Sequence, residues 1–183
     1  MLLPYFYTLF REANTSGVPL IRPLWMEFPS DETTFKNDEA FMVGNSLLVQ
    51  GIFIEQAKHV SVYMPGKESW YDVRTGATYS GGSTHKLEAL EESIPAFQRA
   101  GTIIPRRDRF RRSSTQMAND PYTLRIIIMG HAVGPRNALV EPDNRNVETE
   151  FGPLQLLGRT GPAVLTIRKP GVRVADDWTI KIL

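Results

Sequence analysis

The chain has 183 residues, of which 42% are hydrophobic, 10% aromatic and 22% charged. This composition is that of an ordinary globular protein and excludes wholesale disorder, and the length suffices for one medium domain or two small ones. The formal net charge is only +1, whereas a whole-chain polyanion binder would be far more basic. The absence of cysteine excludes disulfides, zinc–thiolate sites, iron–sulfur clusters and a thiol nucleophile.

The first thirteen residues predict an amphipathic helix that begins without a capping residue. Its apolar side chains recur at helical spacing, at Leu2, Leu3, Phe6, Leu9, Phe10 and Ala13. No basic segment precedes this run and Arg11-Glu12 interrupt it, so we do not interpret it as a signal peptide. No apolar run reaches the length of about 18 residues that a membrane span needs. The simplest interpretation is a helix whose beginning, or whose preceding domain, is missing.

From Val18 onward, short apolar or alternating runs are closed by turn residues, which is typical of an all-β sandwich or barrel. The run His59–Met64 alternates in polarity and stops at Pro65-Gly66. Leu20–Phe28 is read as another such run, and Leu87–Glu92 fits a short helix or a loop.

A polar, basic joint at residues 106–121 separates this region from a second one with β texture. The second region opens with the near-continuous apolar run Tyr122–Met129. Further short strands are expected at Asn137–Val140, Val147–Glu150, Leu154–Leu157, Ala163–Lys169 and Trp178–Leu183.

The sequence offers few candidates for catalysis. His59, His85 and His131 stand far apart and lack liganding neighbours at metal spacing. Adjacent carboxylates such as Asp31-Glu32 would point to opposite faces of a strand, so adjacency builds no acid/base pair. Neither a phosphate-binding glycine loop nor a nucleophile elbow is present. We therefore predict no catalytic residue, no metal site and no cofactor.

Three aromatic residues and one asparagine are the remaining candidate site residues. Trp25, Trp70 and Tyr71 could stack on sugar faces, although aromatic residues in an all-β core more often simply bury area. Asn14-Thr15-Ser16 fits the N-glycosylation acceptor pattern, whose meaning depends on the compartment.

Five of the seven residues from Arg106 to Arg112 are arginines. Such a run fits a phosphate-binding patch, a localisation signal, or a solvated connection whose arginines pair with carboxylates elsewhere. The near-neutral total charge and the lack of a nucleic-acid-binding fold signature favour the solvated connection.

Several stretches, in a fixed order, resemble the end of the catalytic barrel and the following β-sandwich of glycoside hydrolase family 31. They are LLPYFYTLFREA (Leu2–Ala13), GVPLIRPLWMEFPSD (Gly17–Asp31), DEAFMVGNSLLV (Asp38–Val49), VYMPGKESWYDVRTG (Val62–Gly76) and IPAFQRAGTIIP (Ile94–Pro105). The tail continues the likeness with GHAVGPRNALVEP (Gly130–Pro142) and LTIRKPGVRVADDWTIKIL (Leu165–Leu183). Within the family, the likeness is to the glucosidase II α subunit, and to its plant forms in particular.

The resemblance implies an all-β fold with one preceding helix. The helix over residues 1–17 would end the barrel, a proximal β-sandwich would cover 18–108, a basic linker 109–120, and a partial distal β-domain 121–183. The parent class implied is a retaining α-glucosidase that trims glucose from N-glycans in the endoplasmic reticulum lumen and works with a β subunit.

The resemblance also implies that this chain lacks the catalytic carboxylates. The family's nucleophile lies in a W-x-D-M-N-E-like stretch of the barrel, and no such stretch occurs here. No catalytic residue carries over, so we expect the chain alone to be inactive. We recognise no signal peptide, so the sequence indicates no route by which the chain would enter the lumen. The alternative is a stand-alone carbohydrate-binding or structural β-sandwich module, and a nucleic-acid binder using Arg106–Arg112 ranks below both.

The likeness is interrupted near Leu124–Arg125. The letters PYTL resemble the start of the distal domain, whereas RIIIMGHAVGP resembles a much later strand of it. We therefore expect that an intervening stretch is absent and that Tyr122–Met129 fuses two strands of the family.

Overall fold

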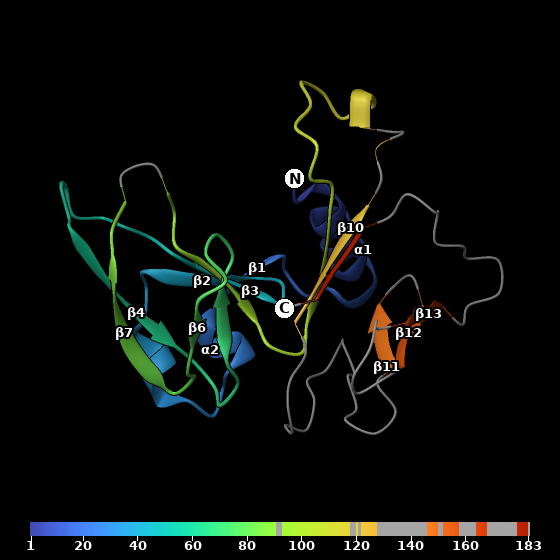
Figure 1. Ribbon diagram of the computed structural model, residues 1–183. Coiled ribbons are helices and arrows are strands. Elements are labelled where there is room, and N and C mark those ends of the chain that lie inside the picture. The colour runs from blue at the N-terminus through green and yellow to red at the C-terminus, as the bar shows by residue number, and fades with distance from the viewer. Residues whose placement is uncertain are drawn as a thin grey trace. The chain divides into compact units, whose positions relative to one another are not determined.

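The computed structural model describes residues 1–90, 93–117, 120 and 122–127, and the strands at 146–149, 152–157, 164–167 and 179–182. The chain divides into two compact units, Gly17–Ala100 and Met1–Ser16 together with Gly101–Leu183 (Figure 1). It is mostly β with an N-terminal helix, as expected. The expected strand Asn137–Val140 and His131 lie outside the described residues, and the domain boundaries drawn from the resemblance stay predictions.

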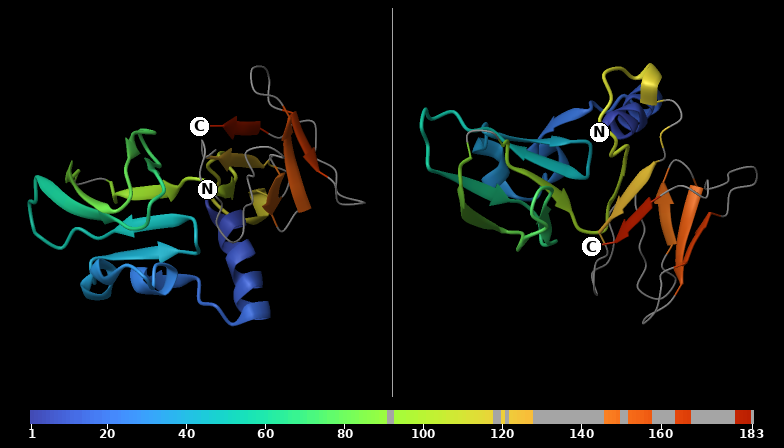
Figure 2. Two further views of the ribbon diagram at one scale, coloured as in Figure 1. Left: turned by 90° about the horizontal axis from the view of Figure 1, so that it is seen from below. Right: turned by 45° about the horizontal axis from the view of Figure 1, so that its top comes forward.

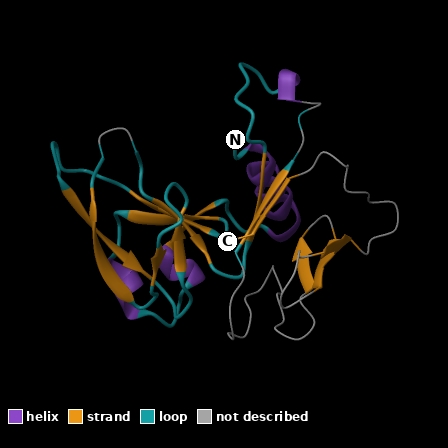
Figure 3. Cartoon of the chain, in the orientation of Figure 1, coloured by secondary structure: helices purple, strands orange, loops and turns teal. Residues whose placement is uncertain are grey.

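The Gly17–Ala100 unit consists mainly of strands and loops, with two short helical turns (Figure 3). Six strands form one sheet in the order β1-β2-β3-β8-β5-β6, and every neighbouring pair is antiparallel. A second sheet pairs β4 with β7, also antiparallel. The bounds are β1 Ile21–Pro23, β2 Ala40–Val43, β3 Leu47–Gln50, β4 His59–Met64, β5 Trp70–Asp72, β6 Thr78–Tyr79, β7 Ser83–Glu88 and β8 Ala96–Arg99.

The segment Leu20–Phe28 is not one strand, so that expectation was wrong. The strand β1 ends at Pro23, and the helix α2 (Leu24–Glu27) begins directly after it. Pro23 is extended, with φ −63° and ψ 155°, and its ring is compatible with the start of a helix. Leu24 and Phe28 are four residues apart, so one helical turn places both in the core.

A 3₁₀ turn, η1 (Glu32–Lys36), follows α2 and contacts it. Asp31 caps this turn, because its carboxylate accepts a hydrogen bond from the Thr33 amide at 3.2 Å. The two short helices lie together on one side of the strands of this unit (Figure 2, left).

One hydrophobic core is shared by both sheets and by α2. Its largest members are fully buried, and partly buried residues such as Leu87 pack against it. The core residues are Leu24, Phe28, Ala40, Met42, Leu48, Val62, Met64, Trp70 and Phe97. The predicted alternation of His59–Met64 is confirmed, since Val62 and Met64 are buried while His59 is exposed. The ambiguous Leu87–Glu92 begins as strand, because Glu88 pairs with His59 at the end of β7.

The other unit contains the helix α1 (Leu3–Ser16), which packs on β9 (Ile103–Arg106). The strand β10 (Thr123–Ile126) lies between β9, to which it is antiparallel, and β14 (Thr179–Ile182), to which it is parallel. A separate antiparallel sheet has the order β11-β12-β13. The remaining bounds are η2 Thr115–Met117, β11 Asn146–Thr149, β12 Gly152–Leu157 and β13 Val164–Ile167.

Candidate functional surfaces

Trp70 has no ring surface available to a ligand. It lies on β5 with 0% of its surface exposed, and its ring packs at 6.2 Å from the ring of Phe28. Its indole Nε1 donates a hydrogen bond to the Pro65 carbonyl at 2.9 Å, which satisfies its one polar atom. Of the two roles considered for this residue, the geometry supports core packing.

Trp25 and Tyr71 lie on different elements and in different surroundings. Tyr71 is half-buried on β5, whereas Trp25 is 49% exposed on α2. Exposed apolar side chains occur on the elements that α2 contacts, β1 and η1. We call Ile21, Trp25, Met26 and Phe35 the α2 surface. Trp25 therefore lies on an element that also exposes Met26 and whose neighbours β1 and η1 each expose an apolar side chain.

The helix α1 has apolar residues on two opposite faces. Tyr5 and Leu9, one turn apart, are each 3% exposed, and the helix packs on β9. Leu3, Tyr7 and Phe10 are 50%, 73% and 61% exposed and form what we call the outer face. The helical spacing grouped Leu3 and Phe10 with Leu9, but the structure exposes the first two and buries the third. Since apolar residues surround much of the helix, their spacing alone did not select the buried side.

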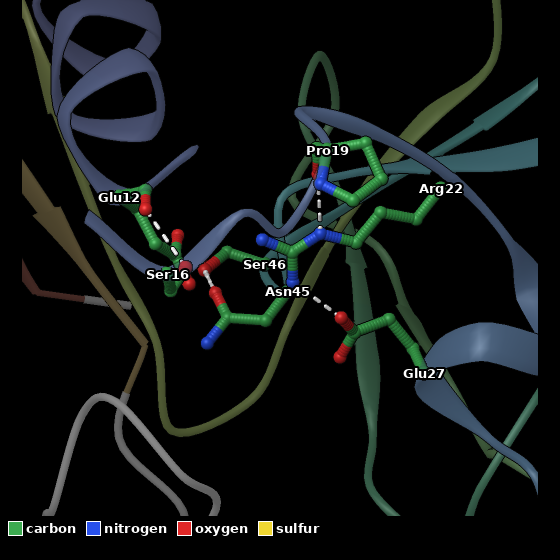
Figure 4. A network of polar contacts seen from close by, with 7 residues as sticks. All are labelled: Glu12, Ser16, Pro19, Arg22, Glu27, Asn45 and Ser46. Carbon is green, nitrogen blue, oxygen red and sulfur yellow. Dashed lines mark hydrogen bonds and ion pairs between the residues drawn. The ribbon is translucent and has the colours of Figure 1, made fainter. Parts of the chain in front are cut away.

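Asn14 is exposed in the last turn of α1. The two hydroxyl residues after it bond back into the helix. Thr15 Oγ1 donates to the Arg11 carbonyl at 3.0 Å. Ser16 Oγ donates to the Glu12 carbonyl at 2.7 Å, as Figure 4 shows. The acceptor pattern is thus on the surface, but in helical rather than loop conformation.

Two buried arginines stabilise the Gly17–Ala100 unit. Arg22 donates from Nε to the Pro19 carbonyl at 2.7 Å and pairs with Glu27 of α2 (Figure 4). Arg99 Nη2 lies 2.5 Å from Glu68 Oε1, and the same guanidinium lies 4.7 Å from the centre of the Phe28 ring. These contacts tie β1 and the end of β8 to the loops and helix next to them.

The environment of two titratable side chains follows from such contacts. Burial alone would raise the pKa of Glu68, but the charge and the hydrogen bond of Arg99 outweigh it, so the pKa of this carboxyl is lowered. Burial, and then the 2.6 Å hydrogen bond that Tyr63 Oη donates to Asp31, raise the pKa of Tyr63. Each of these contacts joins two separate segments of the Gly17–Ala100 unit.

Three arginines of the basic run pair with nearby carboxylates, as the solvated-connection interpretation predicts. Arg111 makes two hydrogen bonds to the Asp120 carboxylate, at 2.9 and 2.7 Å, and Arg109 lies 3.6 Å from the same group. Hydrogen bonds from Arg111 are the main reason why the pKa of Asp120 is lowered. Arg106 pairs with Asp108 at 3.2 Å, and Arg107 lies 4.3 Å over the Tyr122 ring.

Sequence reasoning did not identify the hydrogen-bonded group around His85. Its Nε2 lies 2.9 Å from both Ser83 Oγ and the Ser80 carbonyl, beside the edge of the Tyr79 ring. The short turn between β6 and β7 brings these residues together.

Within the described ranges, no three His, Asp or Glu residues gather where they could hold a metal ion. Among the helices described, none combines the length and apolar character needed to cross a bilayer.

Comparison with known proteins identifies the family. Residues 17–104 match the family model for the glycosyl hydrolase family 31 C-terminal domain. All of the chain aligns with 27% of a protein described as a probable glucan 1,3-alpha-glucosidase of Arabidopsis thaliana, at 53% identity. Neutral alpha-glucosidase AB of Sus scrofa aligns over 99% of the chain and 25% of its own length, at 48% identity. The chain therefore spans about a quarter of the length of these relatives.

The alignment with the Arabidopsis relative extends over 245 residues, although the whole chain has 183. The difference is 62, so at least that many positions within the aligned region have no counterpart here. The expected absence of one intervening stretch at Leu124–Arg125 stays a prediction.

A solved structure extends the likeness to three dimensions. It is described as the endoplasmic reticulum glucosidase II heterodimeric complex of the catalytic subunit and the binding domain of the regulatory subunit. It superposes with a TM-score of 0.67 at 38% identity, over 69% of this chain and 14% of that one. All three of these similar proteins are described as glucosidases. The part of them that this chain matches does not include their catalytic domain. The chain is therefore assigned to the C-terminal region of glycosyl hydrolase family 31 α-glucosidases, related to plant glucan 1,3-alpha-glucosidases and to the glucosidase II α subunit.

Proposed function

We propose that this chain is the supporting C-terminal part of an α-glucosidase that removes glucose from N-glycans in the endoplasmic reticulum lumen. In this proposal, residues 18–108 form the proximal β-sandwich, residues 121–183 form part of a distal β-domain, and the reaction takes place on a catalytic domain outside the chain. The observation that carries the proposal is the apolar character of two exposed surfaces, the outer face of α1 and the α2 surface. Exposed apolar patches of this kind mark interaction sites.

The proposed occupant of these surfaces is the catalytic domain. About three quarters of each curated relative has no counterpart in this chain, and that remainder is available to cover them. A helix with apolar residues on opposite sides is typical of an element buried between two layers. The inner face of α1 packs on β9, and the outer face would receive the second layer.

Association can be tested by expressing the Arabidopsis relative without its homologous C-terminal region, together with this chain carrying an affinity tag. We expect the two to copurify, and we expect Tyr7→Ser with Phe10→Ser to reduce the yield of the complex. The positive control is the relative's own C-terminal region expressed in the same way. Recovery with that control but not with this chain would contradict the proposal.

A regulatory β subunit is the second proposed partner. It is supported by the similar structure of glucosidase II, whose description names a regulatory subunit bound to the catalytic one. Capture of a β subunit by the complex, measured against the copurification of the catalytic part alone, tests this partner separately.

The chain alone should not hydrolyse α-glucosides. Retaining glycosidases need two carboxyl groups facing one sugar, one as nucleophile and one as acid/base. The three shortest ion pairs among the described residues occupy the carboxylates of Glu27, Glu68 and Asp120 with arginines. We therefore expect no turnover of a chromogenic α-glucoside by the purified chain, with the full-length Arabidopsis relative as positive control. Turnover that survives repeated purification would sink this prediction.

Carbohydrate binding is the second candidate function, and the half-exposed ring of Trp25 favours it. A calorimetric titration with glucose-containing oligosaccharides would detect binding and can be repeated on a variant that lacks this ring. The informative variant is Trp25→Ala, because Trp70→Ala would disturb the core instead. An unchanged titration with Trp25→Ala would remove this candidate.

A further inference from the structure

Asn14 lies on the same line along α1 as the exposed apolar residues. Leu3, Tyr7, Phe10 and Asn14 are separated by four, three and four positions, and all four are exposed. Because an α-helix turns by about 100° per residue, these positions fall within a sector of about 60°. The buried Tyr5 and Leu9 lie on the opposite side. Asn14 therefore ends the outer face, about one helical turn beyond Phe10.

The surroundings of Asn14 fit an acceptor that is available before the helix end forms. Asn14-Thr15-Ser16 is the one Asn-X-Ser/Thr triplet in the 183-residue sequence. In the folded helix the Ser16 hydroxyl is bound to the Glu12 carbonyl. Gly17, with φ +76°, ends the helix directly after the triplet. Terminal helical turns open at low free-energy cost, so the triplet can leave the helix while the rest of α1 stays in place.

We infer that Asn14 accepts an N-linked oligosaccharide and that this glycan covers the outer face of α1 in place of an apolar partner. The inference rests on the proposed function for its lumenal compartment. The co-reactant is a lipid-pyrophosphate-linked oligosaccharide. A bond forms between Asn14 Nδ2 and the anomeric carbon of the first sugar, the bond from that carbon to the pyrophosphate oxygen breaks, Nδ2 loses a proton, and the lipid pyrophosphate leaves.

The consequence is competition for one surface. A glycan is bulky and hydrated, and its attachment point is one turn from Phe10, so it occupies the space in which an apolar partner would pack. A chain modified at Asn14 would stay soluble and undocked, whereas an unmodified chain would keep the outer face open. Glycosylation at Asn14 would therefore mark the chains whose outer face had no partner when the modification took place.

The modification is tested with the full chain directed to the lumen by an added signal sequence. We expect a discrete electrophoretic shift that a peptide N-glycosidase removes. The shift should be lost in Asn14→Gln and in Ser16→Ala, but kept in Thr15→Ala. Thr15→Ala is the matched control, because it removes a hydroxyl bonded into the same helix end while leaving the acceptor pattern intact. Lys67→Asn, an exposed position two before Ser69, creates a second acceptor and reports lumenal entry.

The covering of the outer face is tested on the same purified chains with a fluorescent apolar dye. We expect the glycosylated chain to bind less dye than Asn14→Gln, by the same amount that Tyr7→Ser with Phe10→Ser lowers binding in the Asn14→Gln background. Glycosylation at position 67 without any at Asn14 would overturn the modification. Equal dye binding with and without the Asn14 glycan would overturn the covering. Neither readout depends on copurification with the catalytic part, so failure of the proposed function is seen separately.

Discussion

The same kinds of side chain occupy two contrasting regions, the core of the Gly17–Ala100 unit and the exposed apolar surfaces. In the core, Trp70 and Phe97 are fully covered by the unit's own strands. On the outer face of α1 and on the α2 surface, Tyr7, Phe10 and Trp25 are about half exposed or more. Because chemistry does not separate the two sets, the difference lies in what covers them.

The contrast indicates which stabilising interactions the chain supplies by itself. Two sheets and α2 enclose the core, and the ion pair of Arg99 with Glu68 lies beside the core residue Phe28. No described residue covers the exposed surfaces to the same degree. The contrast therefore predicts large effects on folding from core substitutions and large effects on association from surface ones, and each prediction below tests one side of it.

The largest effect is expected from Trp70→Ala. This change removes a fully buried ring, its contact with Phe28 and the hydrogen bond to Pro65. Truncating a buried aromatic residue costs about 3–5 kcal/mol of unfolding free energy, a large part of the stability of a small unit. Urea unfolding followed by near-ultraviolet circular dichroism would measure the loss.

Trp25→Ala is the matched control for this change. It removes the same ring from an exposed position, so we expect a change within about 0.5 kcal/mol. Equal destabilisation by the two substitutions would show that the core and the α2 surface do not differ as described.

A middle-sized effect is expected from Glu68→Gln. The substitution leaves Arg99, beside the Phe28 ring, without its carboxylate partner. A hydrogen bond to a charged group contributes about 1.5–3 kcal/mol, and partial exposure of this pair to solvent screens it to about 1 kcal/mol. The other buried ion pair, between Arg22 and Glu27, is not altered by this change.

The contribution of Glu68 depends on pH. The pKa of Glu68 is lowered in the folded chain, so its stabilisation is present above the unfolded pKa of about 4.3. It is lost as the pH falls through the lower, folded value. We expect the difference in unfolding free energy between the original chain and Glu68→Gln to be constant near neutral pH and to shrink below about pH 4. A difference that stays constant down to acid pH would contradict the assignment.

Parts of the fold were predictable because they depend on local patterns. The alternation of His59–Met64 and the turn at Pro65-Gly66 predicted β4 directly. The helical spacing after Met1 predicted α1. The pairing of basic residues with carboxylates was predicted in kind, and Arg111 with Asp120 realises it. Each of these features is determined by residues close together in the sequence.

Other features depend on partners that are distant in the sequence. Leu87 and Glu88 become strand because their partners in β4, Val60 and His59, lie 27 and 29 positions earlier and pair with them. Leu24–Glu27 is too short for periodicity to separate a helical turn from a strand. Trp70 and Trp25 are the same residue type, and only packing decides which one is buried. Sequence reasoning could therefore propose three aromatic site residues but could not distinguish core from surface among them.

The smallest effect on stability, and the clearest effect on association, is expected from Tyr7→Ser with Phe10→Ser. Both side chains are more than half exposed, and they lie on the side of α1 opposite to the buried Tyr5 and Leu9. Exposed substitutions away from special backbone positions change the unfolding free energy by about 0.5 kcal/mol or less. The same substitutions remove much of the apolar area of the outer face, so dye binding and self-association during size-exclusion chromatography should both fall. If the pair unfolded the chain as Trp70→Ala does, the outer face would be part of the core, and the reason to expect a partner there would be lost.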